Sequence, residues 1–290
     1  SIDFMKENKE EPFFLFLFLS HYDVQLDADK DLNKKKDPDY PGNTVYAAMV
    51  EHVDDSVGDI MQAIEELGLA EHTIFIFYSD NGGVDNRFDN IPLLAGKGKA
   101  AYPEGHPLTY IATSNAPLRT GKGALYEGGI RVPLIVRWPG KVPSGSTSEA
   151  LVSSVNFYPT FLELVQGTAP AKQVLDGFSM LPALTENKFD SEREIFTHYP
   201  IFHHEEPMSA LRKGDWKIVE NLVSGEFELF NLRYDVNEMT DLKFSYSEKT
   251  AEMRAALSKW QSDSNAMNPV ANPGFDPNRR YEWGKHPDRK

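Results

Sequence analysis

Two short runs of apolar residues constrain the fold of this chain more than any other feature. They span Phe13–Leu19 and Thr73–Ser79, and in neither do polar residues alternate with apolar ones. A run without alternation is typical of a strand covered on both faces, as in a parallel sheet packed between helices. The first run is also far shorter than the roughly 20 residues that cross a membrane. We therefore predict that both runs are buried strands.

The segment between these runs has the spacing of an amphipathic helix. Thr44 suits the N-cap position and Gly68 suits the stop. The apolar residues that follow the helical period are Val45, Met49, Val53, Val57, Ile60, Ile64 and Leu67. The order strand, helix, strand predicts a parallel crossover unit. A further strand is predicted over residues 133–138 and a further helix over residues 156–165.

The pattern changes in the last third of the chain. Residues 209–219 and 226–231 are predicted to be half-exposed strands, and residues 247–262 an amphipathic helix. Strands that follow one another along the chain favour an antiparallel sheet, here backed by one helix. We predict an α/β domain over residues 1–192, and a smaller antiparallel-sheet domain with a C-terminal helix and an extended tail over residues 193–290.

Composition excludes several classes of function. The chain has a formal net charge of −14, which repels nucleic acid and anionic membrane surfaces at long range. It has no cysteine, so it has no disulfide, no thiolate nucleophile and no cysteine-built metal site. The sequence also lacks Gly-x-Ser-x-Gly, Walker and His-Glu-x-x-His motifs. We predict that neither nucleic acid nor a membrane is a partner.

The first candidate site follows the second predicted strand. Asp80-Asn81-Gly82-Gly83 comes directly after that strand, and open α/β sheets bind ligands beyond the carboxyl ends of their strands. Adjacent carboxylate and amide oxygens suit a hard cation such as calcium, which takes 6–8 oxygen ligands. An Asn-Gly turn that merely closes the strand explains the same residues. The residues themselves leave both interpretations open.

The second candidate site is the glycine-rich loop around Lys122. Gly121 and Gly123 allow the backbone to approach a ligand closely, and the lysine offers a compact ammonium to an anion. Residues 95–125 carry four basic side chains against one glutamate, which opposes the acidic character of the whole chain. A solvated loop with a few lysines is the alternative interpretation.

Several segments together resemble one enzyme family. The Ser79–Gly83 turn, the Pro117–Pro133 loop and the Pro12–Ser20 segment are similar, in order and spacing, to the formylglycine-dependent (type I) sulfatases of the arylsulfatase kind. Later segments that also resemble this family span residues 176–179, 209–217 and 228–232. The similarity covers nearly the whole chain, and the combination is far more specific than any one segment.

The resemblance implies an alkaline-phosphatase-like α/β fold, with a mixed sheet flanked by helices and a smaller α+β C-terminal domain. It implies hydrolysis of sulfate esters, with a sulfated carbohydrate or an aryl sulfate as substrate, by a periplasmic or secreted protein. By the same resemblance, Asp80 and Asn81 supply two calcium ligands, and Lys122 contacts the sulfate and the bridging oxygen. Calcium and lysine would together offset the charge that develops as the S–O bond breaks.

The sequence departs from the family in two places. The family's nucleophile is a formylglycine made from Cys or Ser in a Cys/Ser-x-Pro-x-Arg motif of the N-terminal part, where an Asp pair completes the calcium shell. Neither element is present, so we predict the C-terminal portion of a sulfatase, inactive alone, whose partner is the missing N-terminal portion. Gln25 stands where the family often has a histidine. Gln25 can bind the sulfate but cannot transfer a proton at neutral pH, and His21 lies about 13 Å back along an extended chain.

His198 is the second predicted substrate-binding residue. With His203 and His204 it surrounds Tyr199-Pro200 at the predicted domain junction, where recognition groups could project toward a substrate. Histidine is often simply half-buried, so a structural role is the alternative interpretation and the one that the pattern favours. Two other functions stay open: a non-catalytic module that binds anions or sulfated glycans, and a phosphodiesterase of the same superfamily. The latter generally needs a His/Asp two-metal cluster, and the sequence contains no evident one.

Overall fold

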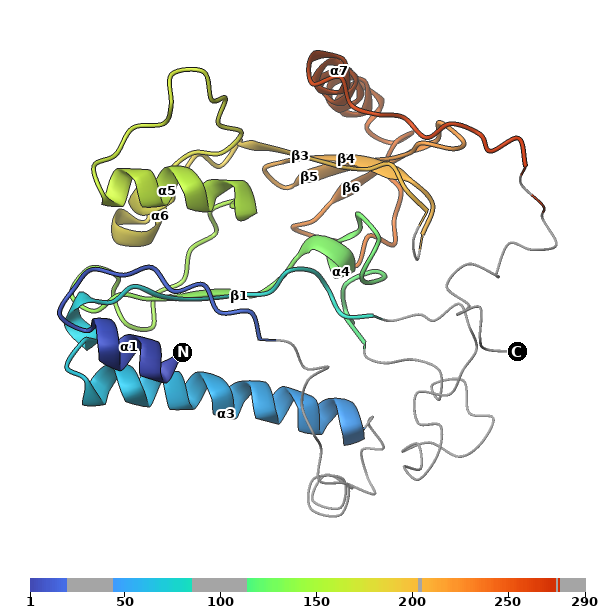
Figure 1. Cartoon of the computed structure of the whole chain (residues 1–290). Coiled ribbons are helices and arrows are strands. Elements are labelled where there is room, and N and C mark those ends of the chain that lie inside the picture. The colour runs from blue at the N-terminus through green and yellow to red at the C-terminus, as the bar shows by residue number, and fades with distance from the viewer. Residues whose placement is uncertain (20–43, 85–113, 203–204, 275, 277–290) are drawn as a thin grey trace.

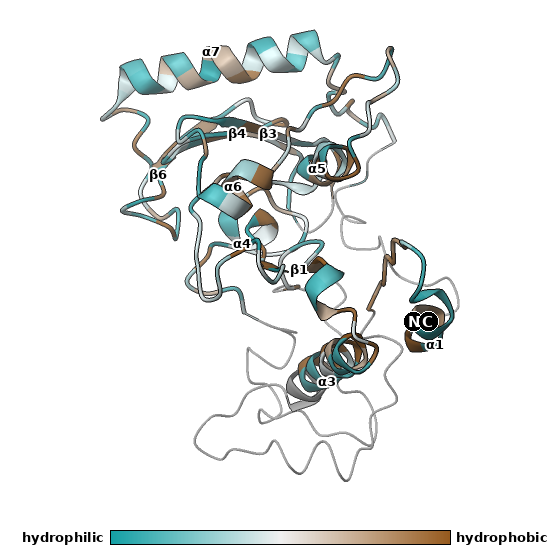
Figure 2. Ribbon diagram, turned by 90° about the vertical axis from the view of Figure 1, so that its left-hand side faces the viewer, coloured by the Kyte–Doolittle hydropathy of each residue, from teal (hydrophilic) through white to brown (hydrophobic). Residues whose placement is uncertain are grey.

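The molecule is built of successive layers (Figure 2). From one end to the other these are α3 (Thr44–Glu66), β1 (Phe75–Tyr78), α4 (Glu127–Ile130), a four-stranded sheet and α7 (Ser247–Asp263). The computed structural model describes residues 1–19, 44–84, 114–202, 205–274 and 276, and the side chains of α3 from residue 49 onward. Among the described helices, none is long and apolar enough to cross a membrane.

The predicted first helix is confirmed as α3, which forms one wall of the first core. The helical spacing of Ile60 and Ile64 buries both on the same side, because residues four apart share one face of a helix. The short helix α1 (Ile2–Asn8) and the 3-10 turn η2 (Ala70–His72) complete this core through Met5 and Ala70.

The predicted strands at residues 73–79 and 133–138 are confirmed as β1 and β2 (Leu134–Arg137). They pair with each other in antiparallel register, with Phe75 opposite Arg137 and Tyr78 opposite Leu134. The predicted parallel crossover unit is therefore not formed by the described residues: β1 has an antiparallel partner from much later in the chain instead.

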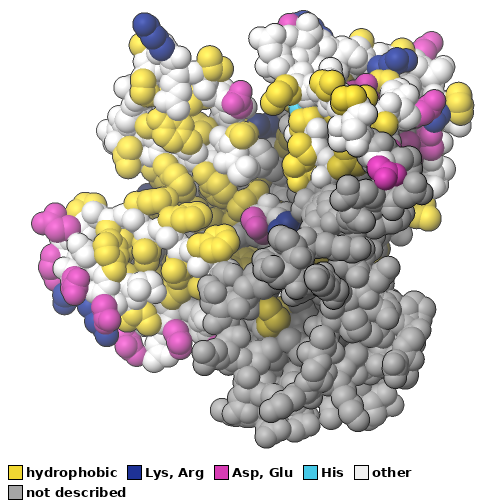
Figure 3. All heavy atoms as spheres, turned by 45° about the vertical axis from the view of Figure 1, so that its right-hand side comes forward, with side chains coloured by type: hydrophobic (Ala, Val, Ile, Leu, Met, Phe, Trp, Pro, Cys, Tyr) yellow, Lys and Arg dark blue, Asp and Glu magenta, His cyan; other side chains and the backbone are white. Residues whose placement is uncertain are grey.

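The prediction of a strand at Phe13–Leu19 is wrong for the described structure. The segment has no strand pairing, and Phe14, Phe16 and Phe18 are 69%, 78% and 69% exposed. Phe13 and Leu15 pack against the first core, whereas the even-numbered rings are not part of it. A run without alternation needs cover on both faces, and on the even-numbered side the described residues provide only partial cover, through the contact of Phe14 with Phe161 at 5.4 Å between ring centroids. Figure 3 shows hydrophobic side chains gathered across the middle of one face of the molecule.

On the opposite side of β1 from α3 lies α5 (Phe157–Leu164), the helix predicted over residues 156–165 (Figure 1). The ring of Phe157 meets Tyr78 of β1 edge to face, with centroids 5.1 Å apart. The 3-10 turn η4 (Ser154–Asn156) leads into α5, and α6 (Leu181–Glu186) packs close by.

The second sheet has four antiparallel strands in the order β3-β4-β5-β6. Their bounds are β3 Glu194–Tyr199, β4 Met208–Lys213, β5 Trp216–Asn221 and β6 Phe227–Asn231. The antiparallel sheet backed by α7 was predicted, but one continuous strand over residues 209–219 was wrong. The chain turns back at Gly214, whose φ of +54° lies in the left-handed region that favours glycine. Strand β3 was not predicted from the residue pattern.

The second sheet has a core on each face. Leu211 and Ile218 pack against α7, whereas Val219 and Phe230 pack against Leu125, which precedes α4. The α/β class of the chain is thus confirmed. The predicted domain boundary after residue 192 stays a prediction, because the 124–126 segment from before that boundary shares a core with the strands that follow it.

Candidate active site

The structure brings the two predicted site loops together. The turn after β1 and the loop before α4 are joined by backbone hydrogen bonds from Gly82 N to Gly129 O at 2.9 Å, and from Lys122 N to Gly83 O at 3.0 Å. The backbone of Lys122 therefore lies against the turn that carries the two predicted metal ligands, although Lys122 follows Gly83 by 39 positions in the sequence.

Asn115 fastens these two loops to each other. Its Oδ1 accepts a hydrogen bond from Gly83 N at 2.9 Å, and its Nδ2 donates to Gly83 O at 2.9 Å and to Thr120 O at 3.0 Å. A side-chain amide has both acceptor and donors, which is what a bridge between two backbone segments needs. The relative position of the loops is thus set by side-chain as well as backbone hydrogen bonds.

Close backbone approach explains two glycines of the site. A Cβ placed on Gly82 would lie 1.7 Å from Gly128 O, and a Cβ placed on Gly128 would lie 2.1 Å from Thr120 O. Neither glycine has a positive φ, so the requirement is space rather than conformation. Any side chain here would push the loops apart.

The predicted metal ligands lie at the surface end of the turn. Asp80 is exposed, and its Oδ1 accepts a hydrogen bond from Asn81 N at 2.8 Å. Asn81 donates through Nδ2 to Gly82 O at 2.9 Å, so Oδ1 is the atom through which it could hold a cation. Two oxygen donors fit calcium in kind but not in number, because calcium takes 6–8 ligands. No group of three or more His, Asp or Glu suited to a metal occurs among the described residues.

Lys122 is half-buried and forms no ion pair with any described residue. Two residues before it, Thr120 has a φ of +57°, an unfavourable conformation for a β-branched residue. Its buried Oγ1 has no hydrogen-bond partner among the described atoms. Backbone strain of this kind persists only where the surrounding structure enforces it, and it is concentrated at functional sites.

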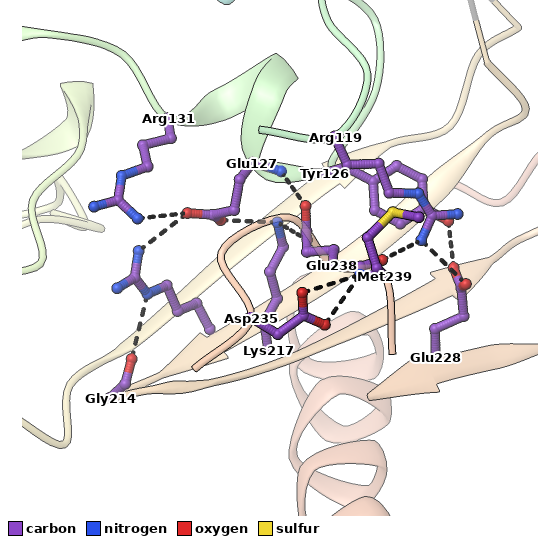
Figure 4. Close-up of polar contacts among 11 residues, drawn as sticks. Arg119, Tyr126, Glu127, Arg131, Gly214, Lys217, Glu228, Asp235, Glu238 and Met239 are labelled. Atoms are coloured by element: carbon purple, nitrogen blue, oxygen red, sulfur yellow. Dashed lines mark hydrogen bonds and ion pairs between the residues drawn. The ribbon is translucent and has the colours of Figure 1, made fainter. Parts of the chain in front are cut away.

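Beneath this loop lies a buried cluster of charges (Figure 4). Lys217 Nζ of β5 lies 2.9 Å from Glu127 Oε1 of α4 and 2.8 Å from Glu238 Oε1, and all three side chains are almost completely buried. The second oxygen of Glu127 pairs with Arg131 at 3.4 Å and Arg212 at 3.5 Å. Glu238 Oε2 accepts a hydrogen bond from the backbone N–H of Glu127 at 2.6 Å.

The two glutamates of the cluster are shifted in opposite directions. Burial alone would raise the pKa of Glu127, but the ammonium of Lys217 and the nearby guanidinium groups outweigh burial and hold that pKa below its usual range. Burial raises the pKa of Glu238 above its usual range, and Lys217 offsets this only in part. The cluster therefore holds one strongly ionised carboxylate and one that is costly to ionise.

Arg119 ties the other end of the loop to the second sheet (Figure 4). Its Nη1 lies 3.2 Å from Glu228 Oε1 and 3.0 Å from Glu238 O, and its guanidinium sits 3.7 Å from the ring centroid of Tyr126. Tyr126 in turn donates to Glu228. Burial, followed by this hydrogen bond to a carboxylate, raises the pKa of Tyr126.

The predicted substrate-binding residues are not brought to this loop by the described structure. His198 projects toward α7, where Nδ1 lies 3.2 Å from Ser209 Oγ and Nε2 lies 2.7 Å from Met267 O. It is on the face of the second sheet opposite α4, and its role in substrate binding stays a prediction. Gln25, His203 and His204 lie outside the described residues.

Three parts of this arrangement were missed from the sequence. Asn115 was not singled out, since an asparagine in a loop usually indicates only a turn. Glu127 offered a weak signal, as a lone acid in the apolar and glycine-rich stretch before β2. Lys217 offered another, because it falls between Trp216 and Ile218 on a strand whose neighbours are apolar.

Two family models match the chain. One described as Sulfatase matches residues 1–168, and one described as N-sulphoglucosamine sulphohydrolase, C-terminal, matches residues 120–263. A protein of Formosa agariphila named Sulfatase is 32% identical over 263 residues, which is 82% of this chain and 43% of that protein.

Solved sulfatase structures are also similar. Ps i-CgsB in complex with k-i-k-neocarrahexaose superposes with a TM-score of 0.70 at 29% identity, over 89% of this chain and 52% of that one. A protein in complex with its substrate D-glucosamine-2-N,6-O-disulfate has a TM-score of 0.59 at 25% identity, over 78% of this chain and 41% of that one. The predicted alkaline-phosphatase-like fold is confirmed by these neighbours. The chain spans about half the length of the relatives it matches.

Proposed function

We propose that this chain, which belongs to the sulfatase family, contributes part of the active site of an enzyme that hydrolyses sulfate esters. The observation that carries this proposal is the hydrogen bond of 3.0 Å between Lys122 N and Gly83 O. It brings the backbone of the loop that bears the ammonium to the turn that bears Asp80 and Asn81.

The proposed role of Lys122 is electrostatic. Hydrolysis breaks the bond between sulfur and the bridging oxygen, and negative charge gathers on that oxygen and on the sulfate. A fixed ammonium beside these atoms lowers the energy of the transition state, because a preorganised charge needs no rearrangement when the reaction occurs. Lys122 suits this role, since no described residue occupies it in an ion pair.

Asp80 and Asn81 would hold a calcium ion next to the Lys122 loop. When bound, the ion supplies positive charge that polarises the sulfate oxygens. The described residues account for two of its ligands, so the proposal assigns the others elsewhere in the protein. Asp80 is exposed, so its carboxylate is accessible to an ion whose other ligands come from another segment.

The proposal assigns the nucleophile to a segment outside this sequence. The chain has no cysteine and no Ser-x-Pro-x-Arg motif that could become formylglycine, so this chain alone is expected to be inactive. The exposed rings of Phe14, Phe16 and Phe18 offer an apolar surface that such a segment could cover, which supports this division of the site.

A sulfated carbohydrate is the proposed substrate class. Its support is the similarity to the protein that was solved with its substrate D-glucosamine-2-N,6-O-disulfate and to the one solved with k-i-k-neocarrahexaose. Aryl sulfates would serve as surrogate substrates, because the proposed chemistry acts on the sulfate group rather than on the alcohol.

The test is the substitution Lys122→Ala in a protein that joins this chain to a segment bearing the formylglycine motif. We expect kcat/KM for a sulfated oligosaccharide to fall about 10²-fold to 10³-fold, as for loss of one oxyanion-stabilising group. Lys172→Ala, at an exposed lysine outside both site loops, is the matched control and should leave kcat/KM unchanged. Full activity of the Lys122→Ala protein would refute the proposed role. Binding of the oligosaccharide without turnover by the unsubstituted protein would instead favour a non-catalytic glycan-binding module.

A further inference from the structure

The segment from Arg119 to Glu127 is held at both ends by the second sheet, and Lys122 lies between these ends. The partners are in strands β5 and β6 and in the loop after β6, some 100 residues later in the chain. None of these partners was expected to take part in the proposed chemistry. These partners flank Lys122 on both sides, so they can fix the position of its backbone.

At the first end, Arg119 makes a directional contact. Its guanidinium donates to Glu228 Oε1 at 3.2 Å and to Glu238 O at 3.0 Å, and it rests on the ring of Tyr126. The planar guanidinium fixes both distance and orientation, unlike a point charge. Three residues before Lys122, the backbone is therefore anchored to β6.

At the second end, Glu127 is anchored to β5 and to the loop after β6. Lys217 Nζ lies 2.9 Å from its carboxylate, and Glu238 accepts its backbone N–H at 2.6 Å. The side chain of Lys217 is 1% exposed, so water does not compete for its bond to Glu127. Five residues after Lys122, the chain is again fixed by the second sheet.

Between the anchors the backbone is constrained rather than relaxed. Thr120 keeps a positive φ of 57° with its buried hydroxyl unpartnered among the described atoms. Ala124 and Leu125 are buried against Val219 and Phe230 of the second sheet. A buried ion cluster contributes little net stability but specifies one geometry, because its charges must meet at defined distances.

We propose that Lys217, acting through Glu127, is a positioning residue that sets where the ammonium of Lys122 lies. This inference rests on the proposed function of Lys122. The second sheet thereby takes part in the reaction without touching the substrate. Loss of Lys217 releases one end of the loop, and the ammonium then no longer sits at the fixed position that electrostatic stabilisation requires.

The test is a double-mutant cycle on kcat/KM for an aryl sulfate, measured in the protein joined to its formylglycine-bearing segment. Lys217→Met should lower kcat/KM about tenfold or more when Lys122 is present, since misplacing a charge by about 1 Å can cost 10²-fold. In the Lys122→Ala background the same substitution should change kcat/KM less than about twofold, because residues that act as a unit are not additive. Lys217→Arg, which keeps the charge, should recover part of the activity.

Thermal unfolding of each variant is measured to check that the variant is folded at the assay temperature. Lys259→Met, at an exposed position of α7, is the matched control. If Lys217→Met does not fold, Arg119→Met tests the other anchor in the same cycle. Equal losses in both backgrounds would overturn the inference and leave the proposed function intact. If Lys122→Ala itself has full activity, the proposed function fails, and the positioning role fails with it.

Discussion

Both faces of the four-stranded sheet bury an apolar core, but among the described residues the face toward α4 also buries a cluster of charges. Toward α7, Leu211, Ile218 and Leu229 are fully buried in an apolar core against the helix, and the small hydroxyl of Ser209 is buried beside them. Toward α4, Lys217 is buried with two glutamates. Adjacent residues of β5 point to opposite faces, because side chains alternate along a strand. One strand therefore supplies an apolar contact and an ionic one.

Apolar packing and buried charges constrain the position of a neighbouring element to different degrees. Apolar burial is roughly proportional to area and is not directional, so it fixes a helix onto a sheet but tolerates small shifts. A buried ion cluster gains little net stability, because desolvation offsets most of the attraction, yet its members must meet at defined distances. Apolar packing on both faces thus accounts for much of the stability, and the buried charges on the α4 face define how the Lys122 loop sits.

Removing the buried cation should have the largest effect on stability. We expect Lys217→Met to lower the free energy of unfolding by about 3–5 kcal/mol, because two buried carboxylates lose their common partner. Urea denaturation followed by circular dichroism measures this change. The triple variant with Glu127→Gln and Glu238→Gln should recover most of the loss, since it removes the unpaired charges. A triple variant less stable than Lys217→Met would mean that the buried charges are stabilising in their own right.

Truncation on the α7 face should have the next largest effect. We expect Leu211→Ala to lower the free energy of unfolding by about 3 kcal/mol through lost burial and a cavity against α7. Ile135→Ala, at an exposed position of β2, is the control and should change it by less than about 0.5 kcal/mol. If a second, polar substitution on the α7 face restored the free energy of unfolding that Leu211→Ala loses, apolar packing would not be what stabilises this face.

Changing pH should change what the buried charges contribute to stability but not what the Leu211 contact contributes. The pKa of Glu127 is lowered, so the stability it contributes is present above the usual glutamate pKa and is lost as pH falls. The pKa of Glu238 is raised, so its contribution has the opposite sign and is lost as pH rises. Unfolding measured across pH should therefore show that the stability lost in Glu127→Gln shrinks in acid, whereas Glu238→Gln gains stability relative to the unsubstituted protein as pH rises toward neutral. The difference from Leu211→Ala should stay nearly constant. Parallel curves for the two glutamate variants would be inconsistent with these opposite shifts.

An exposed ion pair should have the smallest effect. Lys259 pairs with Asp263 on α7, and both side chains are more than half exposed. We expect Lys259→Met to change the free energy of unfolding by less than about 0.5 kcal/mol, since solvent screens such pairs. Urea denaturation of Lys259→Met and Lys217→Met compares the free energy of unfolding lost by the same substitution at an exposed lysine and at a buried one. Equal losses would show that burial does not separate these lysines.

The candidate site was predictable as motifs but not as a connected structure. Asp80, Asn81 and Lys122 were found because their residue types and neighbours are unusual. Asn115, which joins the two loops, has no local pattern that distinguishes it from a turn residue. Lys217 lies on a strand whose charged partner is 90 residues away, so sequence spacing carries no sign of the pair.

The residue pattern by itself determined the local elements of this protein. Helical spacing set α3 and α7, and the apolar run at residues 73–79 set β1. These signals are local because propensity and periodicity act over a few turns. Only the tertiary structure decided which runs find partners: β1 pairs with β2, while Phe13–Leu19 has no strand partner in the described chain. Pairing, burial and the meeting of distant charges depend on which surfaces come together in space, and no local pattern records that.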